Sequence, residues 1–197
     1  WSFKSVVSPP LPDGYAGQGV DYFIGERLVA AGLTALPRAD KYTQLRRLSF
    51  DLTGLPPSFD DMEAFLANED EGAYAAWVDK LLASPQFGER WGRHWLDLAR
   101  YADTKGYVFQ EERDFGFSHT YRDYVVRALN EDKPYDQFIK EQLAADLMTL
   151  EDQRSLAALG FQTLGRRFVG NVHDQIDDKI DVVSRGLMGV TMQCARC

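Results

Sequence analysis

The chain is short of the residues that mark many classes of protein. Of its 197 residues, only two are cysteine, three are histidine and four are methionine. Two cysteines are too few for a scaffold held together by disulfides. No apolar run approaches the roughly 20 residues that span a bilayer, so we expect no membrane insertion. The GxGxxG, P-loop, HExxH and GxSxG motifs are also missing, and with them the common signatures of nucleotide binding, zinc proteolysis and serine hydrolysis.

Positive charge is scarce as well. The chain has 22 Lys and Arg against 30 Asp and Glu, which gives a net charge of −8 and a pI near 4.9. Nucleic-acid binding needs clustered basic residues that displace counterions, so a nucleic-acid partner is not expected. The same shortage argues against binding to an anionic membrane surface.

The first residues resemble neither an initiator segment nor a signal peptide. The opening "WSFKSVVSPPLPDG" has no initiator Met and no charged segment followed by an apolar one. We interpret residues 1–19 as a Pro-rich linker from a preceding domain. The chain is therefore expected to be part of a longer polypeptide.

What the chain has in quantity is apolar residues at helical spacing. A hydrophobic fraction of 45% is sufficient for a core that buries about 70% of the unfolded surface. Helix ends are predicted at Gly32 and Gly54, and helix starts at Ser58 and at Ser84-Pro85. The pattern predicts an all-α fold for residues 20–197: a single irregular bundle of about seven to nine helices, with one long polar loop at residues 103–118.

The predicted helix at residues 86–103 has an unusual polar face. Arg90, His94, Asp97 and Tyr101 recur at intervals of four, three and four residues, so they share one side of the helix. The same helix adds the further polar residues Arg93, Arg100 and Asp103. His94 oriented by Asp97 is a candidate acid–base pair, with the arginines binding an anion. The alternative is a buried network of ion pairs that has only a structural role.

A second polar cluster lies in "HDQIDDKID", residues 173–181. Asp177, Asp178 and Asp181 are spaced so that they share a helix face, and carboxylates this dense repel unless a cation neutralises them. Calcium is one candidate ligand. Pairing with arginines, or an acidic helix N-terminus, accounts for the pattern equally well.

Both cysteines stand at the end, in "MQCARC". Cys194 and Cys197 have the spacing with which two thioethers hold a c-type haem, but the His that normally follows as an iron ligand is absent. No haem is therefore expected on this chain alone. The alternatives are half of a zinc site, a local disulfide, or two free thiols. Met188 and Met192 are better explained by core packing than as iron ligands.

Four stretches carry a family resemblance, in this order: "RRLSFDLTGLPPSFDDMEAFL", "YAAWVDKLLASPQFGERWGRHWLDLARYADTKGY", "YRDYVVRALNEDKPYDQFIKEQLAADL" and "IDDKIDVVSRGLMGVTMQCARC". Together they resemble the planctomycete cytochrome-associated domain family, whose function is unassigned. The resemblance implies a periplasmic or secreted multidomain protein in which the partners are other domains of the same polypeptide, including a cytochrome-c-like domain. It also implies that the terminal motif runs on as Cys-x-x-Cys-His.

Three hypotheses about function follow. The first is a cytochrome-associated module that transfers electrons through a c-type haem completed by residues beyond Cys197. The second is an interaction or scaffold domain without chemistry of its own. The third is a hydrolytic or glycan-related enzyme that uses His94 and Asp97.

Overall fold

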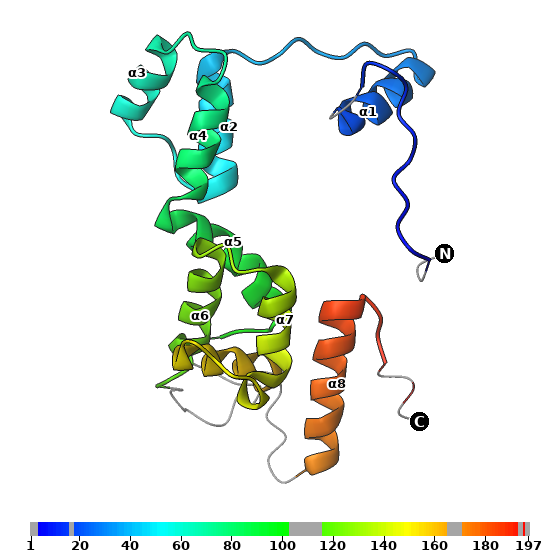
Figure 1. Cartoon of the computed structure of the whole chain (residues 1–197), viewed down its shortest axis with the longest axis vertical. Coiled ribbons are helices and arrows are strands. Elements are labelled where there is room, and N and C mark those ends of the chain that lie inside the picture. The colour runs from blue at the N-terminus through cyan, green and yellow to red at the C-terminus, as the bar shows by residue number, and fades with distance from the viewer. Residues whose placement is uncertain (1–3, 16–17, 103–115, 165–170, 193–194, 196–197) are drawn as a thin grey trace. The chain divides into compact units, whose positions relative to one another are not determined.

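The computed structural model (Figure 1) describes residues 4–15, 18–102, 116–164, 171–192 and 195. In these residues it contains α-helices, two 3-10 segments and no β-strand, which confirms the predicted all-α multi-helix fold. The chain divides into two compact units, residues 1–40 and residues 41–197.

The first unit contains a single helix, α1 (Gly19–Ala30), and none of the residues of α1 is buried. The helix ends as predicted at Gly32, which has a φ of +67°. The amide of Leu33 donates to the carbonyl of Leu28 at 2.8 Å and so satisfies one carbonyl of the last turn. Glycine suits this position because it adopts a positive φ without a steric penalty.

The second unit begins with three helices around a small core: α2 (Lys41–Thr53), α3 (Phe59–Ala67) and α4 (Ala73–Leu82). Their buried side chains are Leu45, Leu48, Phe65, Ala73 and Trp77. The predicted boundaries between them are confirmed. Gly54 ends α2 with a φ of +71°, and the Ser58 hydroxyl caps α3 by accepting from the amide of Asp61 at 3.1 Å.

The remaining helices build the larger core: α5 (Pro85–Leu98), α6 (His119–Asn130), α7 (Tyr135–Ala144), the 3-10 segments η1 (Ala145–Leu147) and η2 (Gln153–Gln162), and α8 (Val172–Met188). Aromatic side chains from four elements meet there, because Trp95 of α5 packs against Phe138 of α7 and Phe161 of η2, and Tyr124 of α6 stacks on Phe138. Phe138, Phe161 and Tyr124 are buried in this core, and Trp95 is partly buried against it.

Glycine allows α5 and α6 to approach closely. A Cβ at Gly88 would lie 2.4 Å from the carbonyl oxygen of Val126, so only a glycine fits. The Gly88 amide donates to the Asn130 side chain at 2.8 Å, and four residues later Gly92 faces Val126. Because the α6 neighbours move back along the chain as α5 advances, the two helices run antiparallel.

The polar helix predicted for residues 86–103 is shorter than expected. It starts at Pro85 and ends at Leu98, because Arg100 takes the left-handed conformation with a φ of +63°. The amides of Arg100 and Tyr101 donate to the carbonyls of Asp97 and Leu96, the pattern of a Schellman C-cap. Ser84 is the N-cap residue and Pro85 the first helical residue, as predicted, but the buried Ser84 hydroxyl makes no hydrogen bond to a described residue.

Candidate functional site

The C-cap of α5 brings the two predicted polar clusters together. Arg100 donates to Asp178 of α8 through both guanidinium nitrogens, with Nη1–Oδ1 at 2.6 Å and Nη2–Oδ2 at 3.1 Å. The side chains are 29% and 12% exposed, so solvent screens this pair only partly. A bidentate geometry of this kind is the strongest that an arginine and a carboxylate form. Two residues predicted to belong to separate sites therefore hold α8 against the bundle.

A second carboxylate of α8, Asp181, pairs within its own helix. Asp181 is buried, accepts a hydrogen bond from Arg185 one turn later, and has a second oxygen without a hydrogen-bond partner among the described residues. Within the described part of the chain, no group of three or more His, Cys, Asp or Glu side chains is arranged to hold a metal ion. Calcium binding by Asp177, Asp178 and Asp181 therefore stays a prediction, and the arrangement of the described residues does not favour it.

His94 and Asp97 lie on the exposed side of α5. The His94 ring is tilted against Trp91, with centroids 5.4 Å apart, and Asp97 faces Arg93 across 4.0 Å. The Arg93 and Asp97 side chains are 76% and 73% exposed. The proposed acid–base pair is therefore open to solvent, and the contact that the structure gives Asp97 is to Arg93. The catalytic role of the pair stays a prediction.

The remaining residues of the predicted polar face contact different parts of the fold. Arg90 is exposed and packs its aliphatic chain over Gly54, where an added Cβ would lie 2.9 Å from its Cδ. Tyr101 is half-buried beyond the end of α5, and its ring lies 6.3 Å from that of Tyr121. Asp103 lies outside the described residues. The structure therefore divides the predicted polar face among α2, α6 and α8.

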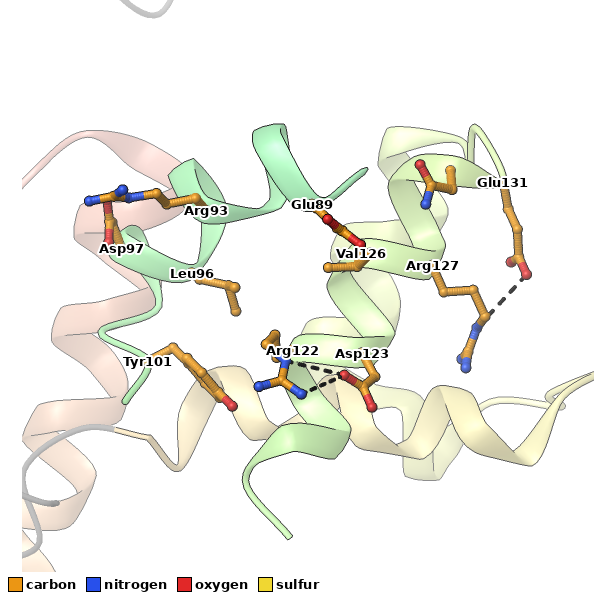
Figure 2. A pocket seen from close by; sticks show the side chains of 11 residues that line it. Glu89, Arg93, Leu96, Asp97, Tyr101, Arg122, Asp123, Val126, Arg127 and Glu131 are labelled. Carbon is orange, nitrogen blue, oxygen red and sulfur yellow. Dashed lines mark hydrogen bonds and ion pairs between the residues drawn. The ribbon is translucent and has the colours of Figure 1, made fainter. Parts of the chain in front are cut away.

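A groove of about 860 Å³ lies between α5 and α6 (Figure 2). Its apolar lining comes from Leu96, Val126 and Tyr101. Its charged rim comes from both helices: Glu89, Arg93 and Asp97 on α5, and Arg122, Asp123, Arg127 and Glu131 on or just after α6. Three of the sequence-predicted residues, Arg93, Asp97 and Tyr101, belong to this groove.

The ion pairs drawn at the groove stay on one helix. Arg122 contacts Asp123 at 3.1 Å, and Arg127 approaches Glu131 at 3.9 Å (Figure 2). Arg127 also lies 3.9 Å from Asp152 and 5.9 Å from the centre of the Tyr124 ring. Such long, partly solvated pairs leave the charges on the rim able to interact with a ligand.

The bundle core contains a separate network around Glu141. This carboxylate is 3% exposed and accepts hydrogen bonds from Lys133, Gln137 and Tyr124 at 2.8–3.0 Å. Burial alone raises the pKa of the Glu141 carboxyl, but the donors outweigh it, Lys133 first, and hold the pKa below its ordinary value. The Glu141 carboxylate is buried and its hydrogen bonds come from neighbouring side chains of the same bundle, so we assign the network a structural role.

Two buried tyrosines share that core. Desolvation by burial raises the pKa of Tyr121 well above its ordinary value, although the hydrogen bond from Trp95 acts in the opposite direction. Burial, together with the hydrogen bond to Glu141, raises the pKa of Tyr124 further. Both phenols therefore stay protonated in the folded protein at neutral pH.

The predicted cofactor cysteines, Cys194 and Cys197, lie outside the described residues. Their position along the chain follows α8 closely, because the helix ends at Gly189, which has a φ of +67°. Met188 and Met192 are 57% and 41% exposed, which contradicts our interpretation of them as core residues. All three histidines, His94, His119 and His173, are exposed.

The sequence interpretation missed the α6 half of the groove. Asp123, Arg127 and Glu131 recur at i, i+4 and i+8, and Glu89, Arg93 and Asp97 repeat the same order of charges on α5. That repetition was a readable signal, but it gains meaning only when the two helices are known to be neighbours.

These observations define an all-α domain with a smaller and a larger hydrophobic core, a charged groove between α5 and α6, and a last helix fixed to the bundle by an ion pair. The chain belongs to the PSCyt2 family, described as a protein of unknown function (DUF1549), whose model matches residues 19–197. The match confirms the planctomycete cytochrome-associated family that the sequence resembles.

Comparison with curated proteins gave no match, and comparison with solved structures gave none either. Among the described residues, no helix has both the length and the apolar composition for crossing a membrane.

Proposed function

We propose that this domain is an extracytoplasmic, cytochrome-associated module that carries a c-type haem for electron transfer at the end of α8. The observation that supports the proposal best is the anchoring of α8. Its N-terminus is capped by Asn171, which accepts from the Asp174 amide at 3.2 Å, and its middle is held by the Arg100–Asp178 pair. A helix fixed in this way gives a cofactor on the following residues a defined attachment point.

The residues of this chain provide part of what a c-type haem needs. Cys194 and Cys197 supply the two thiols for thioether bonds, at the spacing that c-type attachment uses. A bound haem supplies one-electron redox chemistry. The proposal takes its axial histidine from a residue directly after Cys197, because His94 and His119 lie on α5 and α6, and His173 lies in the first turn of α8, at the opposite end of that helix from the cysteines.

The test is a chain extended past Cys197 and produced together with a haem-attachment system. The proposal predicts covalent haem, seen as a Soret band and a pyridine haemochrome spectrum that persist after denaturation. The matched control replaces both cysteines by alanine in the same extended chain and is expected to lose the bound haem. An extended chain without covalent haem would refute the proposal.

A second candidate is a non-catalytic interaction domain, and the α5–α6 groove favours it. The groove combines an apolar lining with seven charged side chains, a composition that suits a protein partner better than a small reactive substrate. The His94–Asp97 enzyme hypothesis has no comparable support, because both side chains are exposed. A domain that binds a partner but never acquires haem would favour the second candidate.

A further inference from the structure

The two buried tyrosines of the larger core differ in what accepts their phenolic hydrogen bonds. The Tyr124 hydroxyl donates to Oε2 of Glu141 at 2.8 Å, whereas the Tyr121 hydroxyl donates to the side-chain amide oxygen of Gln142 at 2.8 Å. A carboxylate at that distance is within reach for direct proton transfer, whereas an amide oxygen does not take up a proton at neutral pH. Tyr124 therefore has a base beside it, and the hydrogen-bond acceptor of Tyr121 is not one.

The surroundings of Glu141 prepare its carboxylate to accept that proton. Burial raises the pKa of the carboxyl, but the hydrogen bonds from Lys133 and Gln137, at 2.8–3.0 Å, outweigh burial and hold the pKa below its ordinary value. Glu141 is therefore ionised at neutral pH. The same hydrogen bonds keep the carboxylate in place when the Tyr124 proton crosses to it, so proton transfer is compatible with the structural role of Glu141.

Two cations near the Tyr124 ring couple the loss of an electron to the loss of the proton. The Lys133 ammonium lies 5.6 Å and the Arg127 guanidinium 5.9 Å from the centre of the ring. A phenol radical cation would place a third positive charge beside them in a largely buried site, which is unfavourable. Transfer of the proton to Glu141 leaves a neutral radical on the ring and avoids that cost.

Aromatic rings connect Tyr124 to the surface of the bundle. The Tyr124 ring stacks on that of Tyr121 with centroids 6.5 Å apart, and the Tyr121 ring lies 6.3 Å from that of Tyr101. Tyr101 is half-buried and lines the α5–α6 groove (Figure 2). Because adjacent aromatic rings transmit an electron better than saturated side chains do, an oxidant at the groove is electronically connected to Tyr124.

We propose that Tyr124 is a redox-active tyrosine, which gives an electron to a high-potential metal complex at the groove and gives its phenolic proton to Glu141. The electron leaves through the rings of Tyr121 and Tyr101. The O–H bond of Tyr124 breaks, an O–H bond forms on Oε2 of Glu141, and the metal complex is reduced by one electron. A one-electron reductant reverses both transfers. All of these residues belong to the haem-free domain, so the inference is independent of the proposed haem.

The test produces the radical in the 197-residue chain with a photochemical oxidant. A light flash on tris(bipyridine)ruthenium(II) in the presence of a cobalt(III) ammine generates ruthenium(III), which is a strong one-electron oxidant. Electron paramagnetic resonance after freezing should show a neutral tyrosyl radical that persists, because a buried radical cannot couple with one on another molecule. Tyr124→Phe should abolish the persistent signal. The matched control is Tyr135→Phe, which removes a tyrosine that is 66% exposed and should leave the signal intact.

Two further variants test the proton acceptor and the position of the radical. Glu141→Gln keeps a hydrogen-bond acceptor for Tyr124 but removes the base, so radical formation should slow by roughly 100-fold or more. Tyr121→Phe keeps the intervening ring and should retain the persistent radical. Circular dichroism checks that each variant is folded, and Tyr124→Phe decides the question if Glu141→Gln is not. No persistent radical in the wild type, a signal that survives Tyr124→Phe, its loss in folded Tyr121→Phe, or an unchanged rate in folded Glu141→Gln overturns the proposal.

Discussion

Arg100 adopts a left-handed backbone conformation and forms a bidentate ion pair with Asp178, 78 residues further along the chain. A non-glycine residue with positive φ is uncommon and costs about 1–2 kcal/mol. The conformation ends α5 and directs the guanidinium toward α8. The left-handed conformation of Arg100 therefore both ends α5 and fixes the position of the last helix.

We predict that Asp178→Ala destabilises α8 selectively. The change leaves the Arg100 guanidinium partly buried without its carboxylate, which should reduce the free energy of unfolding by about 2–3 kcal/mol. Hydrogen exchange should show faster opening of α8 amides while α6 and α7 stay protected. The control is Asp61→Ala, which breaks the more exposed Lys80–Asp61 pair and should lower stability by less than about 1 kcal/mol. If the α8 amides were protected equally in both variants, the Arg100–Asp178 pair would not be what holds α8 in place.

We predict opposite outcomes for two glycine substitutions on α5. Gly88→Ala places a Cβ 2.4 Å from the Val126 carbonyl, so the helices must separate, and stability should fall by about 3 kcal/mol or more. Gly92→Ala places its Cβ 3.5 Å from Val126, an ordinary contact, and alanine is the better helix former by about 1 kcal/mol. Urea denaturation should show a large loss for the first and no loss for the second. Similar values for both would disprove the close crossing.

We predict that Glu141 contributes to stability above its unfolded pKa, which is about 4.3. Its folded pKa is held below the ordinary value, so the contribution is complete above the unfolded pKa and is lost as the pH falls through the folded one. Glu141→Gln should reduce stability at pH 7 by about 2–4 kcal/mol, because Lys133 loses its buried partner. The difference from the wild type should shrink on acidification below about pH 4. A difference that is constant with pH would contradict the network.

We predict a biphasic alkaline titration of the tyrosines. Burial raises the pKa of Tyr121 and Tyr124, so neither phenol should ionise with the exposed tyrosines near pH 10. A raised folded pKa means that stability is complete below the unfolded pKa and is lost as the pH rises above it. Absorbance at 295 nm should therefore show a late phase that coincides with unfolding by circular dichroism. Ionisation of all tyrosines in one early step would contradict their burial.

Local signals predicted much of the fold. The Gly54 stop and the Ser58 cap depend on residues within a few positions of each other, so they were readable from the sequence. The true end of α5 could not be read from the sequence, because an arginine rarely adopts the left-handed backbone conformation. It becomes favourable only through Asp178, which the chain brings close by folding.

The groove was half predicted for the same reason. Arg93, Asp97 and Tyr101 were selected from one unusual helix, whereas Asp123 and Arg127 lie on a helix with an ordinary amphipathic pattern. Their importance depends on the antiparallel crossing at Gly88, a tertiary contact. The sequence left open whether calcium or an arginine neutralises Asp178, because a carboxylate cluster does not show which cation pairs with it. In the structure that cation is the Arg100 guanidinium.

The most direct test of the proposed cytochrome association is the haem content of the extended chain. We predict one covalently attached haem per polypeptide in a pyridine haemochrome assay, held through Cys194 and Cys197. Purified extended chain with no haem, or with haem that organic solvent removes, would contradict the account.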